Sequence, residues 1–90
     1  MDLDIGYCFS KNGQIIYKDL GDGPALIDPY RRTLVKMNPT ALYIWELLDG
    51  GRSVAAIIEI LKAEFEIDPK IIKKDVINFL KELNKREIIK

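Results

Sequence analysis

Histidine is absent from this chain of 90 residues, and Cys8 is the only cysteine. Without a second cysteine the chain cannot form an internal disulfide or a thiolate metal cluster. Without histidine, the common zinc sites and the serine or cysteine catalytic triads are excluded. A glycine-rich phosphate loop is missing too, because Pro24 rather than a helix follows the glycines at 21 and 23. The remaining residue types predict a protein that is not an enzyme and that carries no metal and no organic cofactor.

Net charge and long apolar runs are missing as well. Basic and acidic side chains balance at 14 each, so no overall positive field attracts nucleic acid or an anionic membrane. No apolar stretch approaches ~18 residues, and the N-terminus lacks the basic region followed by an apolar one that is typical of a signal peptide. We therefore expect one domain in the reducing cytoplasm, with neither nucleic acid nor membrane as partner. Residues 68–90 nevertheless hold seven basic and four acidic side chains, a local surface suited to an acidic partner.

The first part of the chain has the alternation and the turn residues of short strands. Residues 1–13 predict either a short strand or an arm that orders only on a partner. A strong Asn-Gly turn signal ends this segment. Strands are then predicted over residues 14–20, 25–28 and 33–37. The last of these alternates so that Thr33, Val35 and Met37 share one face, which we expect to meet the helices.

The second part has the 3.6-residue periodicity of amphipathic helices. Three residues, Asn38, Ser53 and Asp68, can each begin a helix by accepting a backbone N–H with the side chain. Proline follows the first and third of these caps, at the helical position where a missing donor costs nothing. The first helix is expected to end at the glycines at 50 and 51, the second near residue 65 and the third near residue 86.

Trp45 is the only tryptophan and lies on the apolar face of the first predicted helix, where it is expected to anchor the core. Three strands followed by three helices predict one α+β domain. The expected architecture is winged-helix-like, a small N-terminal three-stranded antiparallel sheet followed by three helices. Unlike in the usual winged helix, the strands here precede the helices.

The chain reads Met-Asn-Pro-Thr-Ala at 37–41 before Ile44 and Trp45, Leu-Asp-Gly at 48–50, and Asp-Val-Ile-Asn-Phe-Leu at 75–80. These three motifs, in this order, resemble those of the PqqD family, which includes the leader-peptide-binding domains also called RiPP recognition elements. The likeness covers roughly residues 14–89, so a PqqD-like domain is expected over 14–90, preceded by the arm or strand at 1–13. The family usually ends Arg-Gly-Leu where this chain has Glu at the middle position, so the last turn is expected to run on as helix.

The resemblance implies a non-catalytic peptide chaperone. Such a protein binds the leader segment of a ribosomally made precursor peptide and presents it to a modifying enzyme, either a radical SAM enzyme or a leader peptidase (maturase). In the family the leader adds as a strand to the edge of the third strand and lies against the third helix. The pathway stays open between quinone-cofactor, lasso-peptide and other leader-dependent routes, and the oligomeric state stays open between a monomer and a homodimer.

Strand addition needs an exposed strand edge beside a groove that reads side chains. The third strand has no later strand to cover its edge, and Ile77 lies about 100° round the third helix from Val76, off the main apolar face. We expect a leader to pair antiparallel with residues 34–37 and to pack on this helix, with lysines at the rim favouring acidic residues. Asp75 is expected to be a surface carboxylate paired with a nearby lysine. The predicted peptide-binding residues are Thr33, Leu34, Val35, Lys36, Met37, Lys73, Val76, Ile77, Leu80, Lys81 and Asn84.

Two other functions are compatible with the sequence. A small helix-turn-helix regulator would present Lys70, Lys73 and Lys74 to DNA, although this helix start has no arginine and the net charge is zero. A structural accessory subunit that stabilises a larger enzyme would need only the fold. Salt-dependent DNA binding would favour the regulator, and copurification with no effect of a precursor peptide would favour the accessory subunit.

Overall fold

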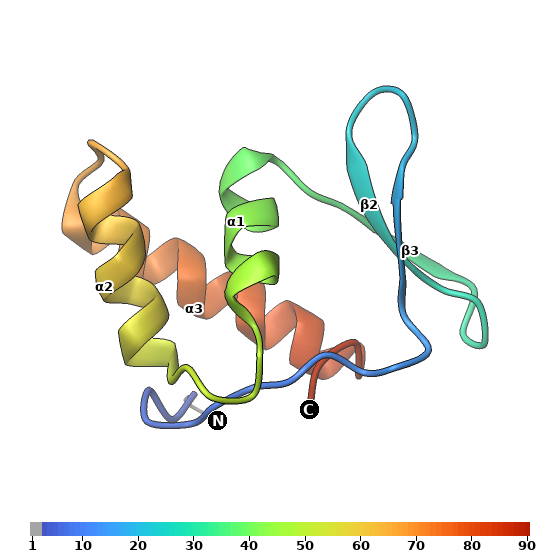
Figure 1. Cartoon of the computed structure of the whole chain (residues 1–90), viewed down its shortest axis with the longest axis horizontal. Helices are drawn as coiled ribbons and strands as arrows, with labels where there is room; N and C mark the ends of the chain where they lie inside the picture. The colour runs from blue at the N-terminus through green and yellow to red at the C-terminus, as the bar shows by residue number, and fades with distance from the viewer. Residues whose placement is uncertain (1–2) are drawn as a thin grey trace.

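Three short strands followed by three helices make up the fold (Figure 1). The computed structural model describes residues 3–90 and measures 34 × 28 × 22 Å. The elements are β1 (Ile16–Asp19), β2 (Pro24–Asp28), β3 (Thr33–Lys36), α1 (Pro39–Leu47), α2 (Val54–Glu64) and α3 (Pro69–Lys85). The predicted class and element order are confirmed, although the first and third strands are shorter than the sequence pattern indicated.

The sheet is antiparallel with the order β1-β2-β3, so β2 is central and β1 and β3 are its edges. Pro24 begins β2, and its carbonyl accepts a hydrogen bond from the Met37 N–H at 2.9 Å. A proline suits the first residue of a strand, because it has no N–H to donate to the ladder. Ala25 and Leu26 of β2 are completely buried, whereas all four residues of β1 are exposed. The sheet therefore joins the core mainly through β2 and the inner face of β3.

The two faces of β3 alternate as the sequence predicts. Thr33 and Val35 are half-buried and Met37, just past the strand, is buried, whereas Leu34 and Lys36 are exposed. One-residue alternation is what a strand gives when only one of its faces meets a core.

The three predicted helix caps are confirmed. The caps lie within hydrogen-bond distance of their backbone donors: Asn38 Oδ1 accepts from Ala41 at 2.8 Å, Ser53 Oγ from Ala56 at 3.1 Å, and Asp68 Oδ1 from Lys70 at 2.9 Å. Each bond satisfies one of the backbone N–H groups that a helix start leaves unpaired. Beyond α1, Gly50 has φ of 79°, a left-handed conformation that glycine adopts without strain. Between residues 3 and 90, no helix is long and apolar enough to cross a membrane.

One apolar core joins the three helices, β2 and both ends of the chain. Its largest aromatic is Trp45, which exposes 7% of its surface, as the sequence predicts. The Lys11 ammonium lies 4.9 Å from the centre of this ring, within the range of a cation–π contact. The buried members are Phe9, Leu26, Met37, Ile44, Trp45, Leu48, Val54, Ile57, Ile58, Leu61, Ile72, Val76, Leu80, Leu83, Ile88 and Ile89.

Residues 3–10 do not form the strand that the alternation of the N-terminal segment allowed, and residues 1 and 2 lie outside the described part of the chain. Residues 3–10 have no regular secondary structure, but their backbone carbonyls accept hydrogen bonds from the first residues of α2. The Tyr7 carbonyl accepts from the Val54 N–H at 2.9 Å, and the Ile5 carbonyl accepts from the Ala55 N–H at 2.8 Å. These two bonds satisfy N–H groups that the Ser53 cap leaves unpaired. The segment therefore contacts the start of α2 through its backbone.

The same segment also holds the C-terminus, beside which it runs in Figure 1. Ser10 and Lys90 exchange two backbone hydrogen bonds of 2.9 Å each, and Lys11 bridges to Ile89. Phe9 is buried between these contacts and the helices. Residues 9–11 and 89–90 are thus packed together against the helices.

The end of α3 contradicts the expectation that its last turn runs on. The helix ends at Lys85, Glu87 takes φ of 58°, and the Ile88 N–H donates to the Leu83 carbonyl at 2.9 Å. The Glu87 N–H donates to the Asn84 carbonyl at 3.0 Å, which completes a Schellman motif. Glu87 therefore occupies the left-handed position that glycine usually fills.

We expect Glu87→Gly to raise the melting temperature. A non-glycine residue in the left-handed region costs about 1–2 kcal/mol, whereas the exposed ion pair between Glu87 and Arg31 contributes at most about 1 kcal/mol. The difference corresponds to a rise of a few degrees for a domain of this size. Glu87→Ala is the matched control, because it loses the ion pair and keeps the strain, so its melting temperature should fall. A lower melting temperature for Glu87→Gly would show that the ion pair dominates.

Candidate functional site

The outer edge of β3 offers unpaired backbone groups. The Met37 N–H bonds to Pro24, and the register places Val35 opposite Leu26. Hydrogen-bonded and non-hydrogen-bonded pairs alternate along an antiparallel ladder, so Val35 exchanges its bonds with β2 while Leu34 and Lys36 turn their N–H and C=O groups outward. No other strand within residues 3–90 pairs with this edge. β3 can therefore accept a further strand through the backbone of two residues.

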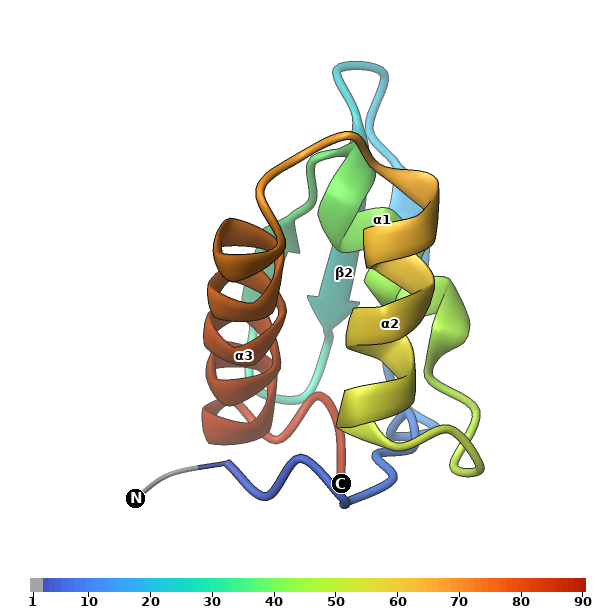
Figure 2. The same cartoon turned by 90° about the vertical axis from the view of Figure 1, so that its left-hand side faces the viewer.

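In Figure 2, α3 passes in front of β3, and the two run in opposite directions. Just before β3, Arg31 forms an ion pair with Glu87, just past the end of α3. Just after β3, Asn38 lines the same cavity as Phe79, from the middle of α3. A strand added to the outer edge of β3 would accordingly run along α3.

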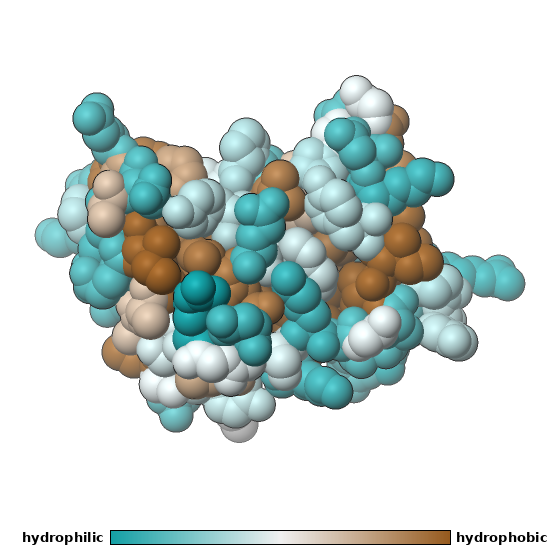
Figure 3. All heavy atoms as spheres, in the orientation of Figure 1, coloured by the Kyte–Doolittle hydropathy of each residue, from teal (hydrophilic) through white to brown (hydrophobic). Residues whose placement is uncertain are grey.

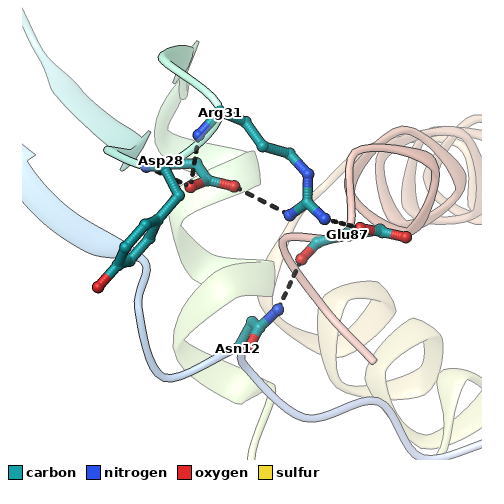
Figure 4. Close-up of polar contacts among 5 residues, drawn as sticks. Asn12, Asp28, Arg31 and Glu87 are labelled. Atoms are coloured by element: carbon teal, nitrogen blue, oxygen red, sulfur yellow. Dashed lines mark hydrogen bonds and ion pairs between the residues drawn. The ribbon is translucent and has the colours of Figure 1, made fainter.

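A polar network fixes the beginning of β3 relative to α3 (Figure 4). Asp28 is completely buried, and its carboxylate accepts from the backbone N–H groups of Tyr30 at 3.0 Å and Arg31 at 3.2 Å. The Arg31 guanidinium donates to the same carboxylate at 3.3 Å and also pairs with Glu87. From the other side, the Asn12 amide donates to the Glu87 carbonyl at 2.9 Å. The turn before β3, the end of α3 and the N-terminal segment are therefore held together.

A cavity of about 270 Å³ lies where β3 ends, between the start of α1 and the middle of α3. Its lining is Asn38, Thr40, Ala41 and Ile44 on one side and Asp75, Asn78 and Phe79 on the other. The apolar part consists of a buried isoleucine, a half-buried alanine and a half-buried phenylalanine, and the asparagines and the aspartate are exposed. Such a cavity has the size and the mixed lining to hold one long side chain. We call it the α1–α3 cavity.

Most charged groups near β3 and the end of α3 are already paired. The Lys36 ammonium lies 2.9 Å from Asp22, and this hydrogen bond and charge lower the pKa of the Asp22 carboxyl. The Arg86 guanidinium lies 2.6 Å from Glu82 and likewise lowers the pKa of the Glu82 carboxyl. Exposed pairs of this kind contribute little stability, but they leave few free charges for a ligand to meet.

Among residues 3–90 the Asp75 carboxylate has no such partner, and the predicted pairing with a lysine is wrong. No hydrogen bond or ion pair joins its carboxylate to any other residue that the structure describes. The reason is its place on the helix, where only side chains three and four residues away are neighbours. Those positions hold Ile71, Ile72, Asn78 and Phe79, none of which is basic.

Two of the predicted peptide-binding residues belong to the core. Val76 and Leu80 are completely buried, so neither offers its side chain to a ligand in this structure. Met37 is also buried, and only its backbone lies near the edge of β3. Of the predicted β3 residues, Leu34 and Lys36 are exposed and Thr33 and Val35 are half-buried.

The remaining predicted residues of α3 lie on the face toward α2. Lys73 lines a separate cavity of about 100 Å³ with Ile5 and with residues of α2. Ile77, Lys81 and Asn84 follow Lys73 along the same face, at 100° per residue. Asp75 is two residues from Lys73 and hence about 200° away, on the opposite side of α3. The cavity just past the end of β3 is therefore lined by a different face of α3 from the one that the sequence predicted for the peptide.

The sequence reasoning missed the α3 residues of the α1–α3 cavity, Asp75, Asn78 and Phe79. Phe79 is half-buried and lines this cavity. A signal was available, because both Asp75 and Phe79 belong to the Asp-Val-x-x-Phe-Leu motif. They stand one helical turn apart, and neither is among the fully buried residues of α3.

Other surfaces have fewer features of a site. Apolar side chains gather in separate patches over α2 and beside the sheet, with polar side chains between them (Figure 3). The second sheet edge, β1, exposes Ile16 and Tyr17, but neither of the two cavities described above borders it. Among residues 3–90, no group of three or more potential histidine, cysteine, aspartate or glutamate ligands could hold a metal ion.

Comparison with solved structures shows that this fold is known. A lasso peptide synthetase B1 complexed with its leader peptide matches 92% of this chain and 98% of its own, with a TM-score of 0.78 and 22% identity. TbiB1 in complex with the TbiA(β) leader peptide matches 90% and 94%, with a TM-score of 0.75 and 21% identity. The PqqD part of Methylobacterium extorquens PqqCD, a RiPP recognition element, matches 91% and 87%, with a TM-score of 0.70 and 20% identity. At these identities the likeness concerns the fold alone.

Comparison of sequences gives a relative and a family. A PqqA binding protein of Gluconobacter oxydans (strain 621H) is 43% identical over 49 residues, which are 54% of this chain and 51% of that protein. The chain thus spans about half the length of this curated relative. The sequence pattern of the family described as "Coenzyme PQQ synthesis protein D (PqqD)" matches residues 25–89, from β2 almost to the C-terminus. On this match over most of its length, the chain belongs to the PqqD family.

Proposed function

We propose that this protein binds the leader segment of a ribosomally made precursor peptide by adding it as a strand to β3. The observation that carries the proposal is the outward-facing backbone of Leu34 and Lys36, beside a helix and next to a cavity. The relative named for binding PqqA and the similar folds solved with leader peptides support the same kind of ligand. The peptide runs antiparallel to β3, as the neighbouring strands do.

The ligand must place side chains in pockets as well as pair its backbone. Two edge residues form up to four backbone hydrogen bonds, at about 0.5–1.5 kcal/mol net for each. A micromolar affinity needs about 8 kcal/mol, after the cost of ordering a flexible peptide has been met. The backbone hydrogen bonds alone therefore give too little binding free energy. Apolar contacts on the inner face of β3 and in the α1–α3 cavity supply the rest of it. Specificity then resides in these pockets, and the backbone pairing tolerates many sequences.

The proposed site combines part of the predicted residues with newly assigned ones. From β3 it keeps Thr33 to Val35 and the edge backbone of Lys36 and Met37. From α3 it takes Asp75, Asn78 and Phe79 in place of the face that carries Lys73 and Ile77.

The protein acts in this proposal as a carrier without catalysis of its own. The chain has no histidine and a single cysteine, so the usual nucleophile–base pairs are missing. A separate enzyme, a radical SAM enzyme or a leader peptidase, modifies the bound precursor in the cytoplasm, and no cofactor is bound by the chaperone itself.

Selection from a random library tests the function without knowledge of the natural ligand. Displayed peptides of 20 residues are selected on the immobilised protein, and enriched sequences are synthesised and titrated into the isotope-labelled chain. We expect micromolar or tighter binding, with the largest amide shifts at Leu34, Lys36 and the middle of α3. Recovery of no binding peptide, or shifts confined to α2, would contradict the proposal. A salt-dependent shift of a DNA duplex would instead point to the helix-turn-helix alternative.

A further inference from the structure

We propose that the α1–α3 cavity selects a basic side chain of the peptide, with Asp75 as the residue that determines this specificity. The inference rests on the proposed function and names the chemistry of the ligand at one position. The first ground is the free carboxylate: Asp75 lines the cavity and has no partner among residues 3–90. By contrast, Lys36 is paired with Asp22, and Arg86 is paired with Glu82.

The second ground is the shape and lining of the cavity. At about 270 Å³ it holds one long side chain. Ile44, Ala41 and Phe79 offer apolar contact to the methylene stem of a lysine or arginine, and the phenyl ring can also face the cation. Asn38 and Asn78 add amide oxygens or N–H groups near the carboxylate, and Thr40 adds a hydroxyl. A purely apolar side chain would cover part of the Asp75 carboxylate without pairing with it, which disfavours such a side chain.

The start of α1 does not use Asp75 as its cap. A helix start favours a nearby negative charge, which would be a purely structural role for this carboxylate. Here the Ala41 N–H is already taken by Asn38, at 2.8 Å. No hydrogen bond from the backbone of α1 reaches Asp75. The carboxylate therefore faces the cavity and is available to a ligand.

The geometry also gives the position of the basic residue in the peptide. The cavity lies beyond the C-terminal end of β3, because Asn38 and Thr40 come directly after the strand. A peptide that runs antiparallel to β3 has its N-terminal end there. The basic residue should therefore stand about two to four residues ahead of the peptide residue opposite Lys36, given the rise of a strand.

This specificity predicts a charge preference that substitutions at Asp75 reverse. Peptides selected on the wild-type protein are made in three versions, with lysine, norleucine or glutamate at the position just described. Against the wild-type protein, the glutamate version should bind at least about tenfold more weakly than the lysine version, with norleucine between them. Asp75→Asn should reduce this difference, and Asp75→Lys should invert it. Glu64→Gln, a carboxylate change at the exposed end of α2, serves as the matched control and should leave the difference unchanged.

The outcomes separate this inference from the function on which it rests. The specificity is overturned if the selected peptides need the edge of β3 but show no preference for a basic residue. It is also overturned if Asp75→Lys shows the same preference as the wild-type protein. Either outcome leaves strand addition to β3 intact. Failure to recover any peptide overturns both. Thermal melts of each variant show that the fold is retained, which is expected because Asp75 is exposed and unpaired. Higher salt should narrow the gap between the lysine and glutamate versions, as it does for a partly exposed charge pair.

Discussion

Leu34→Pro is expected to weaken peptide binding by about 100-fold or more while the domain stays folded. The outward N–H of Leu34 is one of two that an added strand can use, and the proline ring fills the place of the incoming carbonyl. Folding should change little, because this N–H takes no part in the ladder with β2 and the Leu34 side chain is exposed. Proline is tolerated on edge strands for this reason. Isothermal titration with a selected peptide measures the affinity, and a thermal melt measures the fold.

Tyr17→Pro is the matched control on the opposite edge of the sheet. The Leu20 N–H bonds to Gly23 at 2.9 Å, and β1 pairs Tyr17 with Leu26, so the backbone of Tyr17 also faces outward. Tyr17→Pro therefore places a proline ring on the outer edge of β1 at a comparable cost to folding, and peptide binding should persist. Loss of binding in Tyr17→Pro together with unchanged affinity in Leu34→Pro would move the peptide to β1 and refute the site at β3.

The parts of the fold that depend on local chemistry could be predicted from the sequence. A cap such as Asn38 or Ser53 acts on a backbone N–H only three residues away. The alternation of Thr33 to Met37 reports directly which face of a strand is buried. The end of α3 could not be predicted in this way, because Glu87 is strained locally. Burial of Ile88 and Ile89 just beyond it, at about 1.5–3 kcal/mol for each side chain, outweighs that strain.

The candidate site also has one part that could be predicted from the sequence and one part that could not. The order of the strands was enough to predict that β3 is an edge, and the structure has β3 at the edge. Which face of α3 lies along β3 depends on how the whole sheet is attached to the helices. That attachment is made by contacts distant in sequence, such as Arg31 with Glu87. A helical wheel identifies Ile77 as lying beside the buried stripe, but it cannot tell the side toward α2 from the side toward β3.

Trp45→Ala is expected to destabilise the domain by about 3–5 kcal/mol, the usual cost of removing a buried large aromatic. Trp45 exposes 7% of its surface and is the largest side chain in the core. The stability of a small domain is about 5–15 kcal/mol in total, and a chain of this size is expected near the lower end. The loss therefore amounts to a large share, and the melting temperature should fall by well over ten degrees. Urea unfolding followed by circular dichroism measures it, since the variant has no tryptophan to report by fluorescence.

Two milder variants separate the burial of Trp45 from its other contact. Trp45→Phe keeps a ring in the core and should lose less than half as much stability as Trp45→Ala. Lys11→Met removes the cation above the ring while keeping the length of the side chain, and should cost about 0.5–1 kcal/mol of stability.

Trp45 does not line the α1–α3 cavity, although the neighbouring Ile44 does. At a temperature where Trp45→Ala is mostly folded, its affinity for a selected peptide should accordingly match the wild type once the folded fraction is taken into account. A wild-type melting temperature for Trp45→Ala, combined with weaker binding, would instead mean that the indole ring contacts the peptide.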